Sequence, residues 1–183
     1  LLAEKDKGKF GHLGITEYAS IDTGQAMLAR AVEDDCWDVI MAAFHMMNQK
    51  PSTRIFPHTR RSGIGTLNMF AVRDIFSKPE RLRDAMRELA ADGRVPERFA
   101  TSDDPLGFLV HAGGATSIMD AAYRFARHQP GADVVLFGTG NPDHLQANID
   151  SILKPPLPDG DVAKLHDMFG ALVSVGLDMP NNM

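Results

Sequence analysis

The sequence predicts an α/β fold in which short parallel strands alternate with helices. Four short apolar runs are spread over the 183 residues, and a helical pattern follows each run. The last three runs are continuously apolar, which is typical of strands that are covered on both faces of a parallel sheet. Repeated strand–helix order favours βαβ units with right-handed crossovers. Four such strands form either a small open sheet or one half of an eight-stranded barrel.

The composition is that of an ordinary globular domain. Hydrophobic residues make up 44% of the chain and charged residues 23%, and the length suits about one domain. The single cysteine, Cys36, excludes an internal disulfide framework. No apolar run approaches the ~18 residues of a membrane span, and the charged start LLAEKDKGK is unlike a signal peptide. A formal net charge of −5 argues against nucleic acid as a partner. We therefore expect a cytoplasmic protein without nucleic-acid or membrane partners.

The first 33 residues predict a helix, a strand and a second helix. Residues 1–8 resemble the end of a helix that stops at a glycine. Residues 9–16 predict a strand of about six residues that enters a turn. A helix follows over about 20–33, where Ser20 or Asp22 provides the N-cap.

The middle of the chain predicts two more strands and the clearest helix. The apolar run 37–44 predicts the second strand, and 63–72 the third. Between them, 45–62 is polar and interrupted by prolines, with room for a short helix. Residues 78–93 predict a helix with Pro79 in its first turn and an apolar face.

The last part of the chain predicts a loop, a fourth strand and three helices. Residues 94–115 have the composition of a loop, and 117–131 predict a helix. The fourth strand is expected at 132–138, followed by a glycine turn and a helix to residue 153. A final helix is expected at 161–172, before a frayed tail.

The turn FGTGNPDH is the most informative stretch. Gly138 and Gly140 allow the backbone N–H groups to approach a ligand closely. Asn141 is a good N-cap residue and Pro142 suits the first helical position. The start of this helix therefore favours an anion such as a phosphate.

The helix after this turn offers two further candidate side chains. His144 and Asn148 lie four residues apart and share one helix face, within reach of a ligand at the helix start. The alternative interpretation is an ordinary capped turn between strand and helix. The pattern is neither the GxGxxG fingerprint nor a Walker loop.

Four segments form an ordered set: GKFGHLGIT (8–16), WDVIMAAFHMMNQ (37–49), SGIGTLNMFAV (62–72) and VVLFGTGNPDHLQANI (134–149). In this order they resemble the last four strands of the aldo/keto reductases, including a closing GT-x-N-P-x-HL-x-x-N pattern. The resemblance implies the C-terminal half of a TIM-type (β/α)₈ barrel over residues 1–153, with active-site residues at the carboxyl ends of the strands. Residues 154–183 would then be a linker, a helix and a tail.

The resemblance implies NADPH-dependent reduction of an aldehyde or ketone, without a metal or flavin. At the nicotinamide end, Thr16 and Glu17 match the position that binds the nicotinamide amide. Met41 stands where many members have a glutamine with the same task, so one amide contact is weakened. Met69 matches the residue that faces the nicotinamide ring.

At the phosphate end, the resemblance implies that the loop from Phe70 to Arg73 lies near the pyrophosphate. The residues implied around the adenosine phosphate are Gly138, Thr139, Gly140, Asn141, His144 and Asn148. Many members hold the 2′-phosphate of NADPH with Lys or Arg, whereas the matching residues here are Gly138 and His144. NADP is therefore the expected cofactor, with NAD retained as an alternative.

No catalytic tetrad is identified in this chain. The family's catalytic Asp, Tyr, Lys and His come from the first half of the barrel, and neither Tyr18 nor Tyr123 stands in an equivalent position. The seven histidines show no metal-ligand spacing.

The leading hypothesis is half of a carbonyl reductase, whose partners are a small carbonyl substrate and the missing N-terminal half. Unpaired strand edges favour self-association. The alternative is a non-catalytic nucleotide-binding or interaction module.

Overall fold

A computed structural model describes residues 1–177 and confirms the α/β fold with parallel strands. The strands are β1 (Gly14–Thr16), β2 (Val39–Ala43), β3 (Gly65–Met69) and β4 (Val134–Val135). They form one sheet in the order β1-β2-β3-β4, and every neighbouring pair is parallel. Each strand therefore pairs with the next one along the chain, as repeated βα units require.

All four strands are shorter than the sequence predicts, and the two edge strands are the shortest. The first strand was expected over 9–16 but spans three residues, and the fourth was expected over 132–138 but spans two. The central strands β2 and β3 keep five residues each. An edge strand has a hydrogen-bonding neighbour on one side only, so its ends separate more readily from the sheet.

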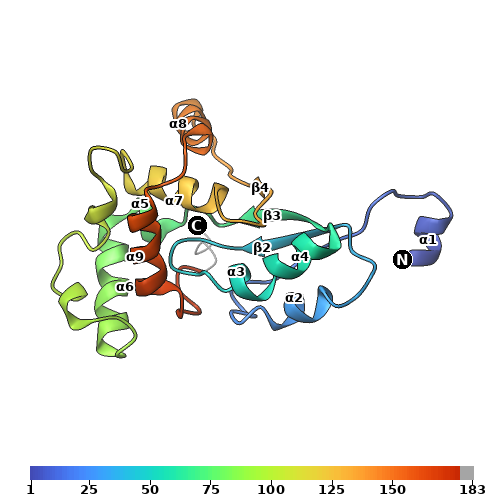
Figure 1. Ribbon diagram of the computed structural model, residues 1–183, viewed down its shortest axis with the longest axis horizontal. Helices are drawn as coiled ribbons and strands as arrows, with labels where there is room; N and C mark the ends of the chain where they lie inside the picture. Colours follow the sequence, from blue (N-terminus) through green and yellow to red (C-terminus); the bar gives the residue numbers. More distant parts are fainter. Residues whose placement is uncertain (178–183) are drawn as a thin grey trace.

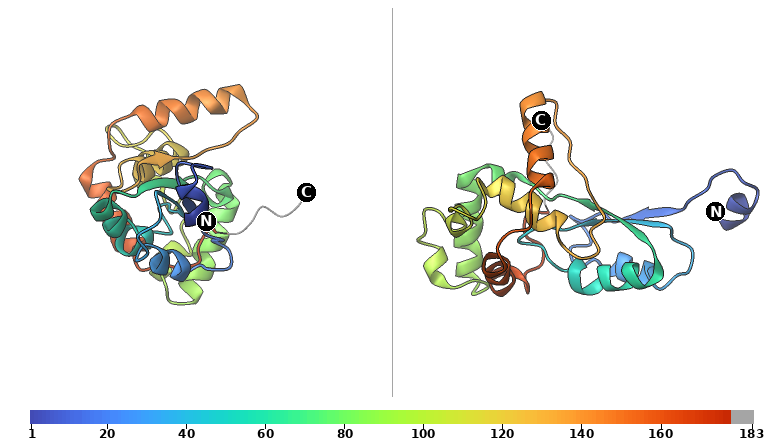
Figure 2. Two further views of the ribbon diagram at one scale, coloured as in Figure 1. Left: turned by 90° about the vertical axis from the view of Figure 1, so that its right-hand side faces the viewer. Right: turned by 45° about the horizontal axis from the view of Figure 1, so that its top comes forward.

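The predicted helices occur in the predicted order, but 45–62 contains two short helices where one was expected, and α5 was not predicted. They are α1 (Leu2–Asp6), α2 (Ala26–Ala31), α3 (Pro51–Arg54), α4 (Phe56–Ser62), α5 (Asp74–Ser77), α6 (Pro79–Ala91), α7 (Ile118–Arg127), α8 (Pro142–Leu153) and α9 (Asp159–Phe169). The loop expected at 94–115 contains two 3-10 turns, η1 (Glu97–Phe99) and η2 (Gly107–Leu109). Figure 1 shows α1 projecting from one end of the molecule, and both views of Figure 2 show α8 standing away from the strands.

The two faces of the sheet differ sharply in burial. One face, termed the outer face, carries Ile40, Thr66 and Val135 and is completely covered. The opposite inner face carries the row Thr16, Met41, Leu67 and Val134, which are aligned partners across all four strands. Val134 is 47% exposed, and Met41 and Leu67 are only partly buried. The expectation that the strands are covered on both faces is therefore wrong for the inner face.

The segment after α8 belongs to the same core as the sheet. Leu165 and Phe169 of α9 are fully buried in the cluster that contains Ile40. The predicted boundary after residue 153 is thus not marked by a break in the core, and the expected frayed tail at 178–183 lies outside the described residues.

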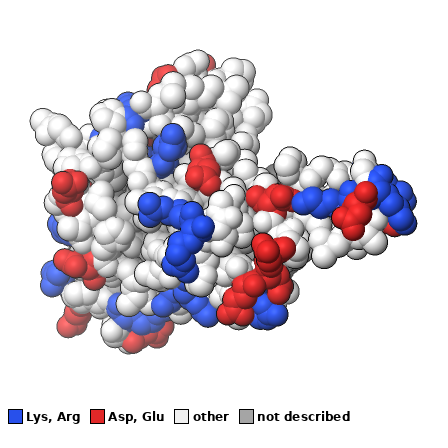
Figure 3. Space-filling view, turned by 45° about the vertical axis from the view of Figure 1, so that its right-hand side comes forward, with Lys and Arg blue, Asp and Glu red and all other residues white. Residues whose placement is uncertain are grey.

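Within residues 1–177, every helix is too short or too polar to cross a membrane. Figure 3 shows basic and acidic side chains interspersed on the face that it presents.

Candidate functional site

The predicted site residues that end β1 and β3 lie at the carboxyl-terminal end of the sheet, whereas His144 and Asn148 lie on α8, which stands away from the strands. Thr16 ends β1, Met69 ends β3, and the glycine turn follows β4. Because all strands are parallel, Thr16 and Thr139 both lie at or beyond the carboxyl ends of their strands, as predicted. Three strand-to-strand steps of roughly 4.8 Å separate β1 from β4, so this edge is about 14 Å wide and suits an elongated ligand.

Glu17 is buried in this edge instead of facing solvent. Its Oε1 accepts the Ala43 backbone N–H at 2.5 Å and the Gln25 amide at 3.0 Å. The same Gln25 amide donates to the Ala43 carbonyl at 3.1 Å. Burial raises the pKa of Glu17, which these hydrogen bonds only partly offset. One oxygen of the carboxylate therefore joins β1, β2 and α2, and Oε2 is the atom that remains for other contacts.

Buried polar atoms without a hydrogen-bond partner concentrate around the end of β2. Within residues 1–177 they include Glu17 Oε2, Gln25 Oε1, His45 Nε2, Asn48 Oδ1 and Asn68 Nδ2. The Asn48 amide donates to the Ala43 carbonyl, and Asn68 Oδ1 accepts the Phe44 N–H. Unpaired buried polar groups are rare and costly, so a cluster of them marks a candidate functional site. Gln25, Asn48 and Asn68 carried no signal in the sequence.

His45 lies just after the end of β2 and is completely buried. Its Nδ1 accepts the Met47 N–H at 3.2 Å, which leaves the proton on Nε2. The ring packs edge-on against Phe76 and lies against the backbone of 175–176. Burial, together with the positive charge of Arg73, lowers the pKa of His45 to about 3. The imidazole is therefore neutral across the physiological pH range.

The loop after β3 has a strained backbone. Phe70 has a φ of 70°, in the left-handed region that bulky residues avoid. The Arg73 guanidinium lies 4.2 Å from the centre of the Phe70 ring. Strain of this kind persists only where the surroundings enforce it, and it is frequent at ligand sites. The strained loop is the one predicted to lie near the pyrophosphate.

The glycine turn contains the predicted helix cap. Asn141 Oδ1 accepts the N–H groups of Asp143 at 2.8 Å and His144 at 3.4 Å, and Pro142 begins α8. The Thr139 hydroxyl accepts the Asn141 N–H at 3.1 Å. These bonds confirm the predicted cap and occupy the N–H groups of the first turn. An anion at this helix start therefore has to use the backbone before Asn141.

That preceding backbone is open. A Cβ added to Gly138 or Gly140 has no atom within 4 Å, and neither residue has a left-handed φ. Nothing else in the described chain therefore requires glycine at these two positions. Open backbone N–H groups beside a helix start fit the approach of a phosphate. His144 is exposed and Asn148 partly buried on the same helix.

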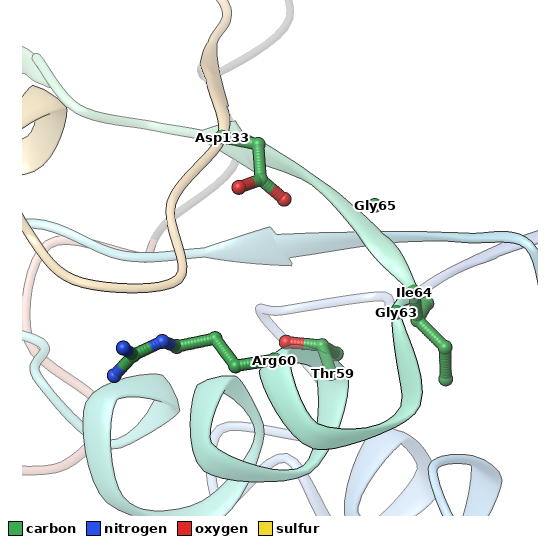
Figure 4. A pocket seen from close by; sticks show the side chains of 6 residues that line it. All are labelled: Thr59, Arg60, Gly63, Ile64, Gly65 and Asp133. Atoms are coloured by element: carbon green, nitrogen blue, oxygen red, sulfur yellow. The ribbon is translucent and has the colours of Figure 1, made fainter.

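Two shallow cavities lie at the opposite end of the strands. The cavity in Figure 4 has about 330 Å³ and is lined by Thr59, Arg60, Gly63, Ile64, Gly65 and Asp133. Gly65 begins β3, and the Asp133 carboxylate already accepts the Thr66 N–H at 2.8 Å. The second cavity, near Asp38, has about 390 Å³. Residues at this end of a barrel usually serve stability, so neither cavity is the candidate site.

Comparisons with known proteins agree with the parallel α/β fold. The sequence model of the Aldo/keto reductase family matches residues 2–168, beyond the residue 153 at which the resemblance was expected to end. No curated protein matches the chain. Among solved structures, the aldo-keto reductase AKR11C1 from Bacillus halodurans is similar in its apo form, with 14% identity and a TM-score of 0.60.

The solved structures are longer than this chain. The match covers 94% of this chain and 56% of apo AKR11C1, and 97% and 57% for the holo form. The glycerol dehydrogenase AKR11B4 from Gluconobacter oxydans is similar at 16% identity and a TM-score of 0.57, with 99% of this chain and 55% of that protein covered. The chain thus spans little more than half of these proteins, and the likeness supports the fold. Through the family match, the chain belongs to the aldo/keto reductase family.

Proposed function

We propose that this chain forms the C-terminal half of an NAD(P)H-dependent reductase that converts an aldehyde or ketone to an alcohol. Family membership supports an oxidoreductase acting on small carbonyl compounds. The observation that carries the proposal is that Thr16 ends β1, Met69 ends β3 and the glycine turn follows β4 in one parallel sheet. These residues are far apart in sequence, and the parallel strand order supports a site at the carboxyl-terminal end of the sheet.

The described residues fit a dinucleotide along this edge. Thr16 and Glu17 Oε2 would hold the nicotinamide amide, and Met69 would pack against its ring. Phe70 and Arg73 would follow the pyrophosphate. Bound there, the cofactor supplies the hydride for the carbonyl carbon.

The adenosine end of the cofactor would lie beside β4. The residues proposed to hold its phosphate are Gly138, Thr139, Gly140, Asn141, His144 and Asn148. Because no Lys or Arg stands among them, NADP and NAD are both retained as cofactors. The open backbone at Gly138 and Gly140 supports this placement.

We infer that the proton donor belongs to the N-terminal half of the barrel. Tyr123 packs against Phe137 on the helix side of the sheet, and Tyr18 is exposed in the loop after β1. Tyr123 is buried, but it lies on α7 and not at the carboxyl-terminal end of a strand. The chain also spans only 55% to 57% of its structural neighbours. The missing half would cover the inner face and pair with the edges of β1 and β4.

The proposal is tested by titrating the chain with NADPH and following cofactor fluorescence. The Gly140→Val variant should bind about tenfold more weakly, a loss of ~1.4 kcal/mol, because a branched side chain blocks the phosphate. Gly160→Val in α9 is the matched control, since a Cβ at Gly160 also has no atom within 4 Å. Equal affinity of both variants and the unmodified chain would remove the glycine turn from the site.

The alternative function is a nucleotide-binding module without catalysis. It is favoured by the exposed position of Tyr18 and the outer position of Tyr123. This alternative predicts NADPH binding without aldehyde turnover even when an N-terminal half is supplied. The reductase proposal predicts turnover under that condition.

A further inference from the structure

The segment that follows α9 returns to the candidate site. Residues 171–177 are termed the C-terminal strap. Leu172 and Val175 are buried in the main core, and the Arg94 guanidinium donates a hydrogen bond to the Val173 carbonyl. Ser174 has a left-handed φ of 65°, which is strained for a residue other than glycine. The strap is therefore held at several points and bent between them.

Leu177 of the strap covers the inner face at its carboxyl-terminal end. It is 2% exposed and forms a separate small cluster with Ala19 and Ala43. Met69 and Phe70 pack against the same cluster. Ala43 and Met69 are aligned partners at the last step of the β2–β3 ladder, on the same face as Met41 and Leu67. The strap thus buries the part of the inner face where the nicotinamide ring is proposed to lie.

The strap packs closely against α5 and against His45. A Cβ on Gly176 would lie 3.0 Å from Ile75 Cγ2 and 3.2 Å from His45 Cε1. Gly176 also has a left-handed φ of 61°. Glycine is required here both for the backbone turn and for the close approach. The close packing at Gly176 therefore fixes the position of the strap against His45.

We propose that the C-terminal strap is an autoinhibitory lid, and that Leu177 must leave the small cluster with Ala19 and Ala43 before a dinucleotide packs against Met69. This inference rests on the proposed function, because it assigns Met69 and Phe70 to the cofactor. One apolar side chain and the nicotinamide ring compete for the same surface. The apparent affinity for the cofactor is then reduced by the fraction of molecules whose strap is open.

The experiment compares NADPH affinity in two leucine variants of the full chain. Leu177→Ala removes the largest side chain of the small cluster against which Met69 packs, and we expect a dissociation constant about tenfold lower, as for a site open in roughly a tenth of molecules. Leu172→Ala is the matched control, because Leu172 lies on the same strap but packs into the main core. It should leave the affinity near that of the unmodified chain.

Hydrogen exchange of the unmodified chain gives a second readout. Addition of NADPH should accelerate exchange at 171–177 while residues of β2 stay protected. Unchanged affinity of Leu177→Ala, or slower exchange of the strap with NADPH, would overturn the lid and leave the proposed function intact. Absence of NADPH binding by the chain and by both variants would instead reject the proposed function, and the lid with it.

Discussion

Two ionisable side chains at the carboxyl-terminal edge are shifted towards their neutral forms. Burial raises the pKa of Glu17 and lowers that of His45 to about 3. Both residues hold backbone groups near the end of β2, since Glu17 accepts the Ala43 N–H and His45 accepts the Met47 N–H. Each of the two residues therefore combines a hydrogen bond to the backbone with a shifted pKa. A single substitution at Glu17 or His45 should therefore affect the carboxyl-terminal end of the sheet as a whole.

His45 makes the stability of the chain pH-dependent. Between about pH 3 and the ordinary value of 6.5, the unfolded chain binds a proton at this imidazole and the folded chain does not. Stability should therefore rise with pH across this window and fall on acidification. Urea unfolding at several pH values measures the effect.

The comparison variants for this prediction are His45→Gln and His58→Gln. His45→Gln should flatten the pH dependence, whereas His58→Gln should retain it because His58 is a partly exposed residue of α4. Equal pH dependence in the two variants would show that His45 is not the responsible group.

At the scale of elements, a buried arginine fixes the connection between α8 and α9. The Arg124 guanidinium of α7 donates to the carbonyls of Gly114 at 2.8 Å, Pro155 at 2.8 Å and Pro156 at 2.9 Å. Asp120 lies one turn away, 3.5 Å from Arg124. Burial tends to raise the pKa of Asp120, but hydrogen bonds from Thr116 and other neighbours leave it lowered. The chain segment after α8 is thereby attached to α7.

Replacing this arginine should loosen the attachment. Arg124→Met keeps the side-chain length but leaves three carbonyls without donors, so the free energy of unfolding should fall by about 3 kcal/mol. Arg127→Met on the same helix is the control, because Arg127 is exposed and should change stability by less than about 0.5 kcal/mol. Chemical denaturation decides between them, and a similar loss in both variants would contradict a specific role for Arg124.

At the scale of the whole molecule, the inner face and the two sheet edges are the open surfaces. The row of Thr16, Met41, Leu67 and Val134 is mostly apolar, and Leu136 continues it beyond β4 with 36% exposure. In a complete barrel such a face forms the packed interior. In the isolated chain it is available to other molecules, together with unpaired N–H and C=O groups at the edges.

The isolated chain should therefore self-associate and lack reductase activity. Light scattering should show oligomers, and Val134→Lys should reduce them because a charge on the inner face resists burial. Met27→Lys is the control, since Met27 is 38% exposed on the outer helix α2.

An NADPH-oxidation assay with several aldehydes tests the second half of this prediction. General acid catalysis alone is typically worth about 10²–10⁴-fold, so its absence should leave no measurable turnover. Turnover by a monodisperse monomer would show that the catalytic residues lie within this chain.

The sequence by itself determined the features that depend on local chemistry. The Asn141 cap forms as predicted. The Asp22 carboxylate accepts the N–H groups of Ala26 and Met27, but the helix begins later than predicted, with Gln25 as its N-cap. Strand order also followed from the sequence, because repeated βα units pair neighbouring strands in parallel. The parallel direction of the strands was then sufficient to place Thr16 and Met69 at the same end of the sheet.

Tertiary structure alone decided which groups meet at that edge. Glu17 turns inward to Gln25 and Ala43, and Leu177, more than a hundred residues after Met69 in the sequence, joins the small cluster against which Met69 packs. Neither contact has a periodic or motif signal, because each depends on where a distant segment ends in space. The uncovered inner face is likewise a property of the assembled sheet: a continuous apolar strand shows that both faces avoid water, but not which part of a protein covers each face.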